Sequence, residues 1–302
     1  MTNFVLKNLK AMPYGGAEAV VSQHSNKLVE ELVQASSSAL WDTDVQDRFL
    51  EKYRKWISES KLNALQGLDN FPITAYSNGA TESFDKFYLD NSSCRFRCFR
   101  GEYMYHMASW RNYFNWLFLE DGALNSNDAV VISLPFSDTG NIHQDTNDIL
   151  DQALELNVPV LIDCAFFGCC SDINFDLSHP AIKVITFSLS KSFPVPHLRI
   201  GMRLTRIDDD DSLLVTNKTK YTNRIGASVG EQLIDIISAD WNSQQWQETQ
   251  YRLCQELGVT PSNTVLFGVD TQNKYSQYNR GGKTSRLNLA KYLVTGALPN
   301  ND

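Results

Sequence analysis

The chain has 302 residues, of which 42% are hydrophobic and 21% charged, as expected for a water-soluble globular protein with a substantial core. Its formal net charge of −8 argues against nucleic acid or an anionic membrane as the main partner. The six cysteines show no metal-ligand spacing, so we expect no metal site and a cytoplasmic protein with reduced thiols. We also expect no membrane span and no signal peptide, because no long apolar run and no basic-then-apolar N-terminus occur.

Hydrophobic periodicity predicts helical structure over residues 17–61 and then a different pattern from about 72 to 205. There, short apolar runs alternate with helical segments at 80–89 and 145–156. The runs that we interpret as strands are 73–76, 95–99, 129–134, 158–162, 184–187 and 200–204. This alternation predicts an α/β fold with a mostly parallel, mixed sheet between layers of helices.

The C-terminal third of the chain has a different composition of elements. The four aspartates at 208–211 indicate a solvated turn, and a helical pattern follows over roughly 219–257. Two strand-like runs at 265–269 and 285–289 precede a short closing helix. These features predict a smaller α+β domain at the C-terminus.

A single lysine, Lys191, follows the apolar run at 184–187 in the sequence Ser188-Leu189-Ser190-Lys191. A desolvated amine at a strand end loses its proton and becomes a nucleophile suited to imine chemistry. Ser188 and Arg199 flank this lysine at a spacing that could clamp a phosphate through a hydroxyl and a bidentate guanidinium. A lysine that forms a Schiff base beside a phosphate clamp suggests pyridoxal 5'-phosphate (PLP).

The same Ser-x-x-Lys spacing also occurs in serine acylases of the penicillin-recognising kind. In this chain Lys191 follows a strand and does not lie in the first turn of a helix, and the other motifs of those enzymes are missing. We therefore set this alternative aside.

Two further strand ends carry polar groups that suit a phosphorylated ring. Gly79-Ala80-Thr81 lies between a strand and a helical pattern, where small residues leave the backbone N–H groups of a helix N-terminus open to phosphate. Asp163 ends a fully apolar strand, and a carboxylate buried there needs a partner. The pyridinium nitrogen of PLP would be such a partner.

Together with Arg199-Ile200-Gly201 and Ser285-Arg286-Leu287-Asn288-Leu289, these blocks resemble the fold-type I PLP-dependent enzymes, the aspartate aminotransferase superfamily. The resemblance follows the family's chain order from Gly79 to Arg286. It implies that Lys191 forms the Schiff base, that Asp163 keeps the ring nitrogen protonated, and that Arg286 holds the substrate carboxylate. The phosphate would be bound by Gly79, Ala80, Thr81, Ser188 and Arg199.

Three further positions follow from the resemblance alone. Tyr103, or failing that Tyr105, matches the aromatic residue that stacks on the cofactor ring. Ser137 and Phe166 stand where the family has an asparagine and often a tyrosine that bind the cofactor's phenolic oxygen. Both positions are departures from the family pattern, and they leave the reaction type open.

The resemblance implies an aminotransferase that moves an amino group from an α-amino acid to a 2-oxo acid. A PLP-dependent decarboxylase, lyase or racemase, or a non-catalytic protein of the same fold, remain alternatives. It also implies a homodimer, for which the aromatic segment 103–118 offers apolar interface area. The expected organisation is an N-terminal helical segment (1–45), a PLP-binding large α/β domain (46–207) and a small C-terminal domain (208–302).

Overall fold

The computed structural model describes residues 12–110 and 113–298 of the chain. Its main element is a seven-stranded sheet with the strand order β2-β9-β8-β6-β5-β3-β4. These strands are β2 (Ile73–Asn78), β3 (Arg95–Cys98), β4 (Trp116–Phe118), β5 (Asp128–Ser133), β6 (Val160–Cys164), β8 (Ile182–Ser188) and β9 (Ile200–Thr205). β9 runs antiparallel to both of its neighbours, and the other strand pairs are parallel. The predicted mixed, mostly parallel α/β fold is thus confirmed.

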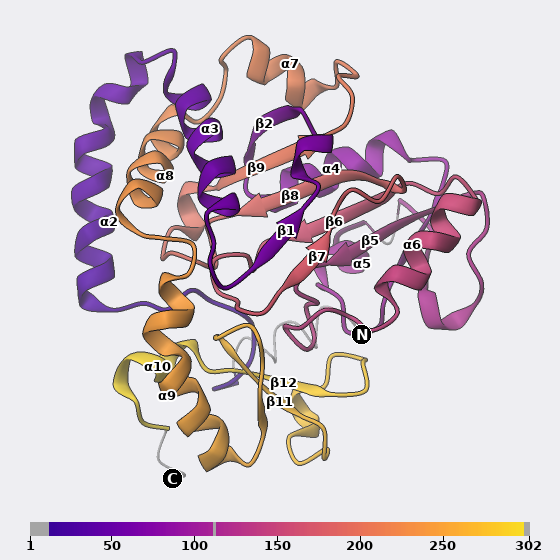
Figure 1. Cartoon of the computed structure of the whole chain (residues 1–302), viewed down its shortest axis with the longest axis vertical. Coiled ribbons are helices and arrows are strands. Elements are labelled where there is room, and N and C mark those ends of the chain that lie inside the picture. The colour runs from indigo at the N-terminus through magenta and orange to yellow at the C-terminus, as the bar shows by residue number, and fades with distance from the viewer. Residues whose placement is uncertain (1–11, 111–112, 299–302) are drawn as a thin grey trace.

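Helices cover both faces of this sheet, as Figure 1 shows. The α-helices in the described part of the chain are α2 (Gln23–Ala35), α3 (Val45–Ser58), α4 (Ala80–Asp90), α5 (Tyr105–Trp110), α6 (Thr146–Glu155), α7 (Ser212–Lys218), α8 (Arg224–Ile236), α9 (Trp241–Leu257) and α10 (Ala290–Thr295), of which the last two belong to the smaller sheet described below. Successive residues of β5 point to opposite faces of the sheet. Val130 packs in the hydrophobic core that includes α3 and α8, and Val131 packs in the core that includes α4. Burial on both faces explains why the central strands are continuous apolar runs.

A second, smaller sheet lies below the large one in Figure 1. It consists of the antiparallel strands β10 (Thr260–Pro261), β11 (Phe267–Asp270) and β12 (Ser285–Asn288). Helices α9 and α10 pack against it, and Leu253, Phe267 and Leu287 lie in its core. Tyr14 and Val20 belong to the same core, so the N-terminal segment is joined to the C-terminal unit.

The N-terminal region is less helical than the sequence predicted over 17–61. α2 begins only at Gln23, where Ser22 and Ser25 form a capping box, with a hydrogen bond of 3.0 Å from the Ser25 N–H to the Ser22 hydroxyl. A 3₁₀ helix, η1 (Ser36–Trp41), then separates α2 from α3.

The region after the large sheet also differs from expectation. The predicted helix over 219–257 is two helices, α8 and α9. In the large unit, α7 contacts β2 and α8 contacts α3. Helices α7 and α8 therefore pack against elements of the large sheet. Asp211 is not part of a solvated turn: it caps α7 by accepting from Leu214 N–H at 2.8 Å, and it pairs with the buried Arg203.

The strands that the sequence did not predict are short. They are β4, β10, and the separate parallel pair β1 (Ala64–Gln66) and β7 (Asn174–Asp176). Within residues 12–110 and 113–298, the structure contains no helix that combines the length and hydrophobicity needed to cross a membrane.

Candidate functional site

The carboxyl ends of β2, β5, β6 and β8 meet at one edge of the large sheet, because these strands are parallel. β9 is antiparallel, so its first residue lies at this edge too. The edge therefore brings together Gly79, Ser137, Asp163, Lys191 and Arg199, each of which lies at the end of one of these strands or in the turn beside it. Such an edge is where open α/β sheets bind ligands.

Lys191 lies just beyond β8, and its amine is enclosed by the N-terminal segment. Nζ donates a hydrogen bond of 2.6 Å to the carbonyl oxygen of Ala17. Burial lowers the pKa of this amine to about 8, and the positive charge of Arg286 acts in the same direction. About a tenth of the amine is thus uncharged at pH 7, far more than for an ordinary lysine, and the uncharged form is the nucleophile.

Asp163 is buried near the end of β6, and it interacts electrostatically with Lys191. One carboxylate oxygen accepts from the Ala165 N–H at 2.9 Å. Burial raises the pKa of Asp163 to about 7, and the nearby charge of Glu102 adds to this effect. The carboxylate can therefore hold or release a proton near neutral pH.

Gly79 and Arg199 form a cradle at the N-terminus of α4. Nη2 of Arg199 donates to the Thr81 hydroxyl at 2.8 Å and to the Asn78 carbonyl at 2.9 Å. Gly79 has a φ of +72°, and a Cβ at this position would lie 2.4 Å from Nη2 of Arg199. Ala80 begins the helix, whose first-turn N–H groups have no partner within the helix. A guanidinium beside open N–H groups is a site for an anion such as phosphate.

Ser188 lies beside this cradle, at the end of β8, and is buried. Its hydroxyl donates to the Ile200 carbonyl at 3.3 Å and shares a hydrogen bond of 2.8 Å with the Ser190 hydroxyl. The hydroxyl of Ser188 is thus bonded both within its own turn and to the first residue of β9, and the Ser190 hydroxyl lies beside it.

Tyr103 follows β3, and 39% of it is exposed. Its ring lies 6.0 Å from that of Tyr105 at an interplanar angle of 15°. Burial and the charge of Asp163 raise the pKa of its phenol, whereas Arg199 and Arg286 act in the opposite direction. Tyr103 therefore lies within electrostatic range of the groups at both ends of the candidate site.

Arg286, on β12, is only 5% exposed. Nη1 donates to the Ser137 carbonyl and Nη2 donates to the Gly16 carbonyl at 3.0 Å, while the guanidinium lies 4.3 Å from the centre of the Phe267 ring. Nε has no hydrogen-bond partner among the described residues. A buried guanidinium with a free donor is suited to bind a carboxylate.

Ser137 and Phe166, the two positions that depart from the family pattern, have different surroundings. The buried Ser137 contacts Arg286 and also Arg280, whose Nη1 donates to the Ser137 carbonyl at 3.0 Å and to its hydroxyl at 3.1 Å. The Phe166 ring packs edge-on against Phe267 at 5.1 Å, in the core of the small unit. Phe166 therefore supports the wall of the site by packing and offers no hydrogen bond.

Sequence reasoning did not single out three components of this site. Glu102 is buried and accepts hydrogen bonds from Ser133 N–H at 2.9 Å and Tyr103 N–H at 2.8 Å. Arg280 and the segment of Gly16 and Ala17 were also missed. Arg280 stands close to Arg286 in the sequence, in a loop that contains glycines, and this could have indicated that it belongs to the site. The backbone carbonyls of Gly16 and Ala17 leave no such signal in the sequence.

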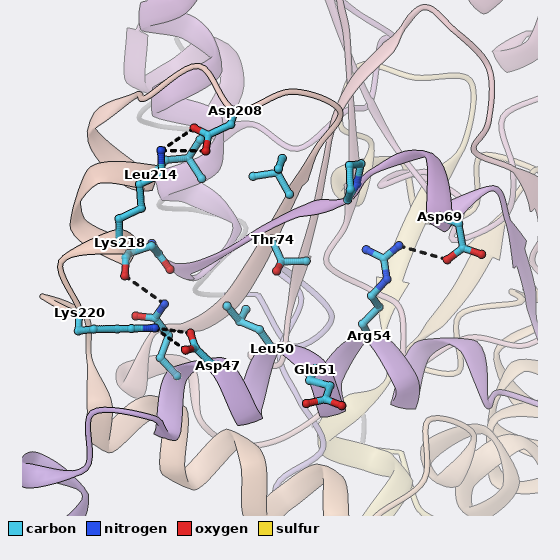
Figure 2. A pocket seen from close by; sticks show the side chains of 14 residues that line it. Asp47, Leu50, Glu51, Arg54, Asp69, Thr74, Asp208, Leu214, Lys218 and Lys220 are labelled. Atoms are coloured by element: carbon cyan, nitrogen blue, oxygen red, sulfur yellow. Dashed lines mark hydrogen bonds and ion pairs between the residues drawn. The ribbon is translucent and has the colours of Figure 1, made fainter.

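A groove of about 670 Å³ lies elsewhere, between α3, α7 and the strand β2 (Figure 2). Most of its charged side chains are paired, as Lys220 with Asp47, Lys218 with Asp208 and Arg54 with Asp69. None of the predicted site residues lines it. Because its lysines and its arginine are already paired with carboxylates, we do not assign it a ligand.

Comparisons with known proteins agree on the fold. No protein-family model and no curated protein sequence matches the chain. Among solved structures, a PLP-bound C-S lyase from Staphylococcus hominis has a TM-score of 0.67 and 11% identity over 93% of this chain and 88% of its own. A probable N-succinyldiaminopimelate aminotransferase from Thermus thermophilus has a TM-score of 0.64 and 13% identity, covering 98% of this chain and 96% of its own.

A third similar structure is an L-threonine-O-3-phosphate decarboxylase from Porphyromonas gingivalis, with a TM-score of 0.63 and 13% identity over 93% of this chain and 96% of its own. The three proteins carry out different reactions on one architecture. The chain thus has the fold of the fold-type I PLP-dependent enzymes, the aspartate aminotransferase superfamily.

Proposed function

We propose that the chain is a PLP-dependent enzyme that acts on the amino group of an α-amino acid, and specifically an aminotransferase. The observation that carries the proposal is the presence of Lys191 and Asp163 at one sheet edge, both buried, with pKa values of about 8 and about 7. Perturbed amines and carboxylates of this kind gather at sites of chemistry. The shared fold supports the same conclusion.

The residues at this edge fit PLP. Gly79 leaves room beside Arg199 that a Cβ would fill, so the cradle with Thr81 and Ser188 would hold the phosphate. Asp163 would pair with the ring nitrogen, and Tyr103 would lie against the ring. When bound, the cofactor supplies an electron sink for bonds at the substrate's α carbon.

The chain's own residues would then perform distinct tasks. Lys191 would attach the cofactor covalently until the substrate's amino group displaces it, and the freed Nζ would then take a proton from the α carbon and return one. Asp163 would keep a proton on the ring nitrogen, and Arg286 would orient the substrate by its α-carboxylate. A 2-oxo acid would bind in the same place to receive the amino group.

Borohydride reduction tests the covalent role of Lys191. The purified protein should be yellow, and mass spectrometry after reduction should find the cofactor on Lys191. Lys191→Ala should lose the adduct. An adduct on another lysine, or no bound cofactor after incubation with PLP, would contradict the proposal.

A PLP-dependent lyase or decarboxylase is the second candidate. It is favoured by Phe166, whose ring packs on Phe267 and has no hydroxyl, and by Ser137, whose carbonyl and hydroxyl face arginines. A non-catalytic protein would have no chemical need for both Lys191 and Asp163. Incubation with an amino-acid panel, with and without 2-oxo acids, separates these possibilities: an aminotransferase consumes both partners, whereas a decarboxylase releases carbon dioxide without an acceptor.

We also propose a cytoplasmic homodimer. The proposed interface segment 103–118 includes residues 111–112, which lie outside the described residues, while its first residue, Tyr103, belongs to the site. An interface here would bring the partner subunit close to the cofactor. Light scattering at micromolar concentration should give twice the mass of 34.2 kDa, and a monomer would contradict this proposal.

A further inference from the structure

Arg280 places a second guanidinium directly beside Arg286. It lies in the loop between η5 (Ser276–Tyr278) and β12. Nη1 of both arginines donates to the Ser137 carbonyl, and Nη2 of Arg280 donates to the Glu102 carbonyl at 3.2 Å. Two like charges thus share one neutral oxygen inside the site.

Within the part of the chain that the structure describes, neither arginine forms an ion pair. Their hydrogen-bond acceptors are backbone carbonyls and the Ser137 hydroxyl. Asp138 and Glu102 act on both arginines only through longer-range electrostatics, and burial raises the pKa of both acids. Arg286 is buried and Arg280 is partly buried. A charge that is withdrawn from water without an ionic partner is costly, so a negatively charged ligand would stabilise this arrangement.

The loop that carries Arg280 is held in one conformation. The Asn279 side chain donates to the Thr284 carbonyl at 2.9 Å and to the Gly282 carbonyl at 3.1 Å, which closes the loop on itself. The Thr284 hydroxyl then donates to Asp138 at 2.9 Å, which ties the loop to the turn after β5. These contacts preorganise the guanidinium of Arg280. Because Arg280 is only partly buried, a ligand can still reach it.

The α-carboxylate of a substrate needs only one of the two arginines, because a single guanidinium can bind a carboxylate through two hydrogen bonds. The second arginine is then left for another group. We propose that Arg280 binds a second anionic group of the substrate, so that the site selects amino acids whose side chain ends in an acid. The inference rests on the proposed function, since it takes Arg286 as the partner of the α-carboxylate. Arg280 would then determine specificity, and Lys191 would perform the chemistry.

Calorimetric binding of glutarate and of its monoamide tests this inference on the cofactor-loaded protein without requiring turnover. A hydrogen-bonded charge pair predicts that glutarate binds about 10- to 100-fold more tightly than the monoamide. Arg280→Gln should bring this ratio near one, and Arg280→Lys should keep part of it. The ratio of kcat/KM for glutamate over glutamine should change in parallel.

Arg206→Gln is the matched control. Arg206 is likewise partly buried and donates to backbone carbonyls, those of Ile182 at 2.8 Å and Ser178 at 2.8 Å, but it lies outside the site. This variant should keep the full preference for the diacid. A wild-type protein that prefers neither glutarate over its monoamide nor O-phosphoserine over serine would overturn the inference. An Arg280→Gln variant that weakens the acidic ligand and its uncharged counterpart equally would do the same, and would leave Arg280 a support for the Ser137 turn.

Two more outcomes are informative. If O-phosphoserine over serine shows the Arg280-dependent preference and glutarate over its monoamide does not, the second anionic group is a phosphate, which still supports the inference. If the protein binds no cofactor, the proposed function fails, but an Arg280-dependent preference for the diacid remains measurable on the same protein. Failure of the function and failure of the specificity assignment are therefore distinguishable.

Discussion

The Nζ of Lys191 donates its 2.6 Å hydrogen bond to the carbonyl oxygen of Ala17, a residue 174 positions earlier in the chain. The preceding carbonyl, that of Gly16, accepts from Arg286. One short segment thus occupies the two groups that a cofactor and a substrate would need. Its attachment to the small unit, through Tyr14 C=O and the Asn288 N–H at 2.9 Å, keeps it over the site.

Weakening this segment should speed cofactor loading. Gly16 has a φ of +80° with open space around its Cβ direction, so Gly16→Ala should strain the segment by about 1–2 kcal/mol without a clash. If that strain is relieved when the segment moves, PLP should load about 5- to 30-fold faster in stopped-flow absorbance. Gly258→Ala, with a φ of +66° at the end of α9, is the remote control, and equal rates in both variants would argue that the segment does not restrict access.

Asp163 should make the stability of the cofactor-free protein depend on pH. Burial raises its pKa to about 7, above the ~3.9 of an unfolded aspartate, so the folded state binds this proton more tightly. The stabilisation is fully present below about pH 4 and is lost as the pH rises through 7. Asp163→Asn removes this titration, so between pH 5 and pH 8 the wild type should lose on the order of 2–3 kcal/mol relative to the variant.

Urea unfolding of both proteins at the two pH values measures this difference. Lys191 titrates in both proteins, and its lowered pKa acts mainly above pH 8, where the uncharged amine favours the folded state. A stability difference that stays constant from pH 5 to pH 8 would show that Asp163 is already ionised at the lower pH.

Gly79→Ala should weaken cofactor binding through Arg199. The added Cβ would lie 2.4 Å from Nη2 and would force the guanidinium out of its contacts with Thr81. Loss of one charge-assisted contact to phosphate predicts an affinity for PLP about 10- to 100-fold lower, measured by absorbance titration. Gly258→Ala carries a similar backbone penalty without this clash, so it should bind PLP normally. Unchanged affinity in Gly79→Ala would remove Arg199 from the phosphate site.

Arg286→Ala should lower kcat/KM for the amino acid by a factor that corresponds to about 2–4 kcal/mol of lost transition-state stabilisation. The reason is that the α-carboxylate loses a bidentate partner in a buried site. Arg286→Lys should recover little, since an ammonium cannot replace the planar guanidinium. The absorbance of bound PLP should persist in both variants, because the phosphate contacts come from other residues. Normal turnover, or loss of cofactor with unchanged substrate affinity, would contradict the assigned role.

The central predicted strands of the large sheet were identifiable because they are buried on both faces and therefore form nearly continuous apolar runs, as at 129–134 and 158–162. The strands that were missed, such as β1 and β7, have three residues each and too little periodicity to detect. The break between α8 and α9 was missed for a related reason. Both helices are amphipathic, and the turn between them lacks glycine and proline, so their patterns join.

The amino-acid sequence alone determined which residues could carry the chemistry at the strand ends. Lys191, Asp163 and Gly79 each follow or end a buried run, where a polar or unusually small residue needs a reason. Tertiary structure decided which other groups meet them. The Ala17 carbonyl and Arg280 reach the site only because the N-terminal segment packs into the small unit and that unit docks on the sheet edge. Every residue has a carbonyl, so the contact of Ala17 leaves no trace in the sequence. Arg280 stands near Arg286 in the sequence, but most arginines are solvated, and only the tertiary packing decided that it contacts the Ser137 turn.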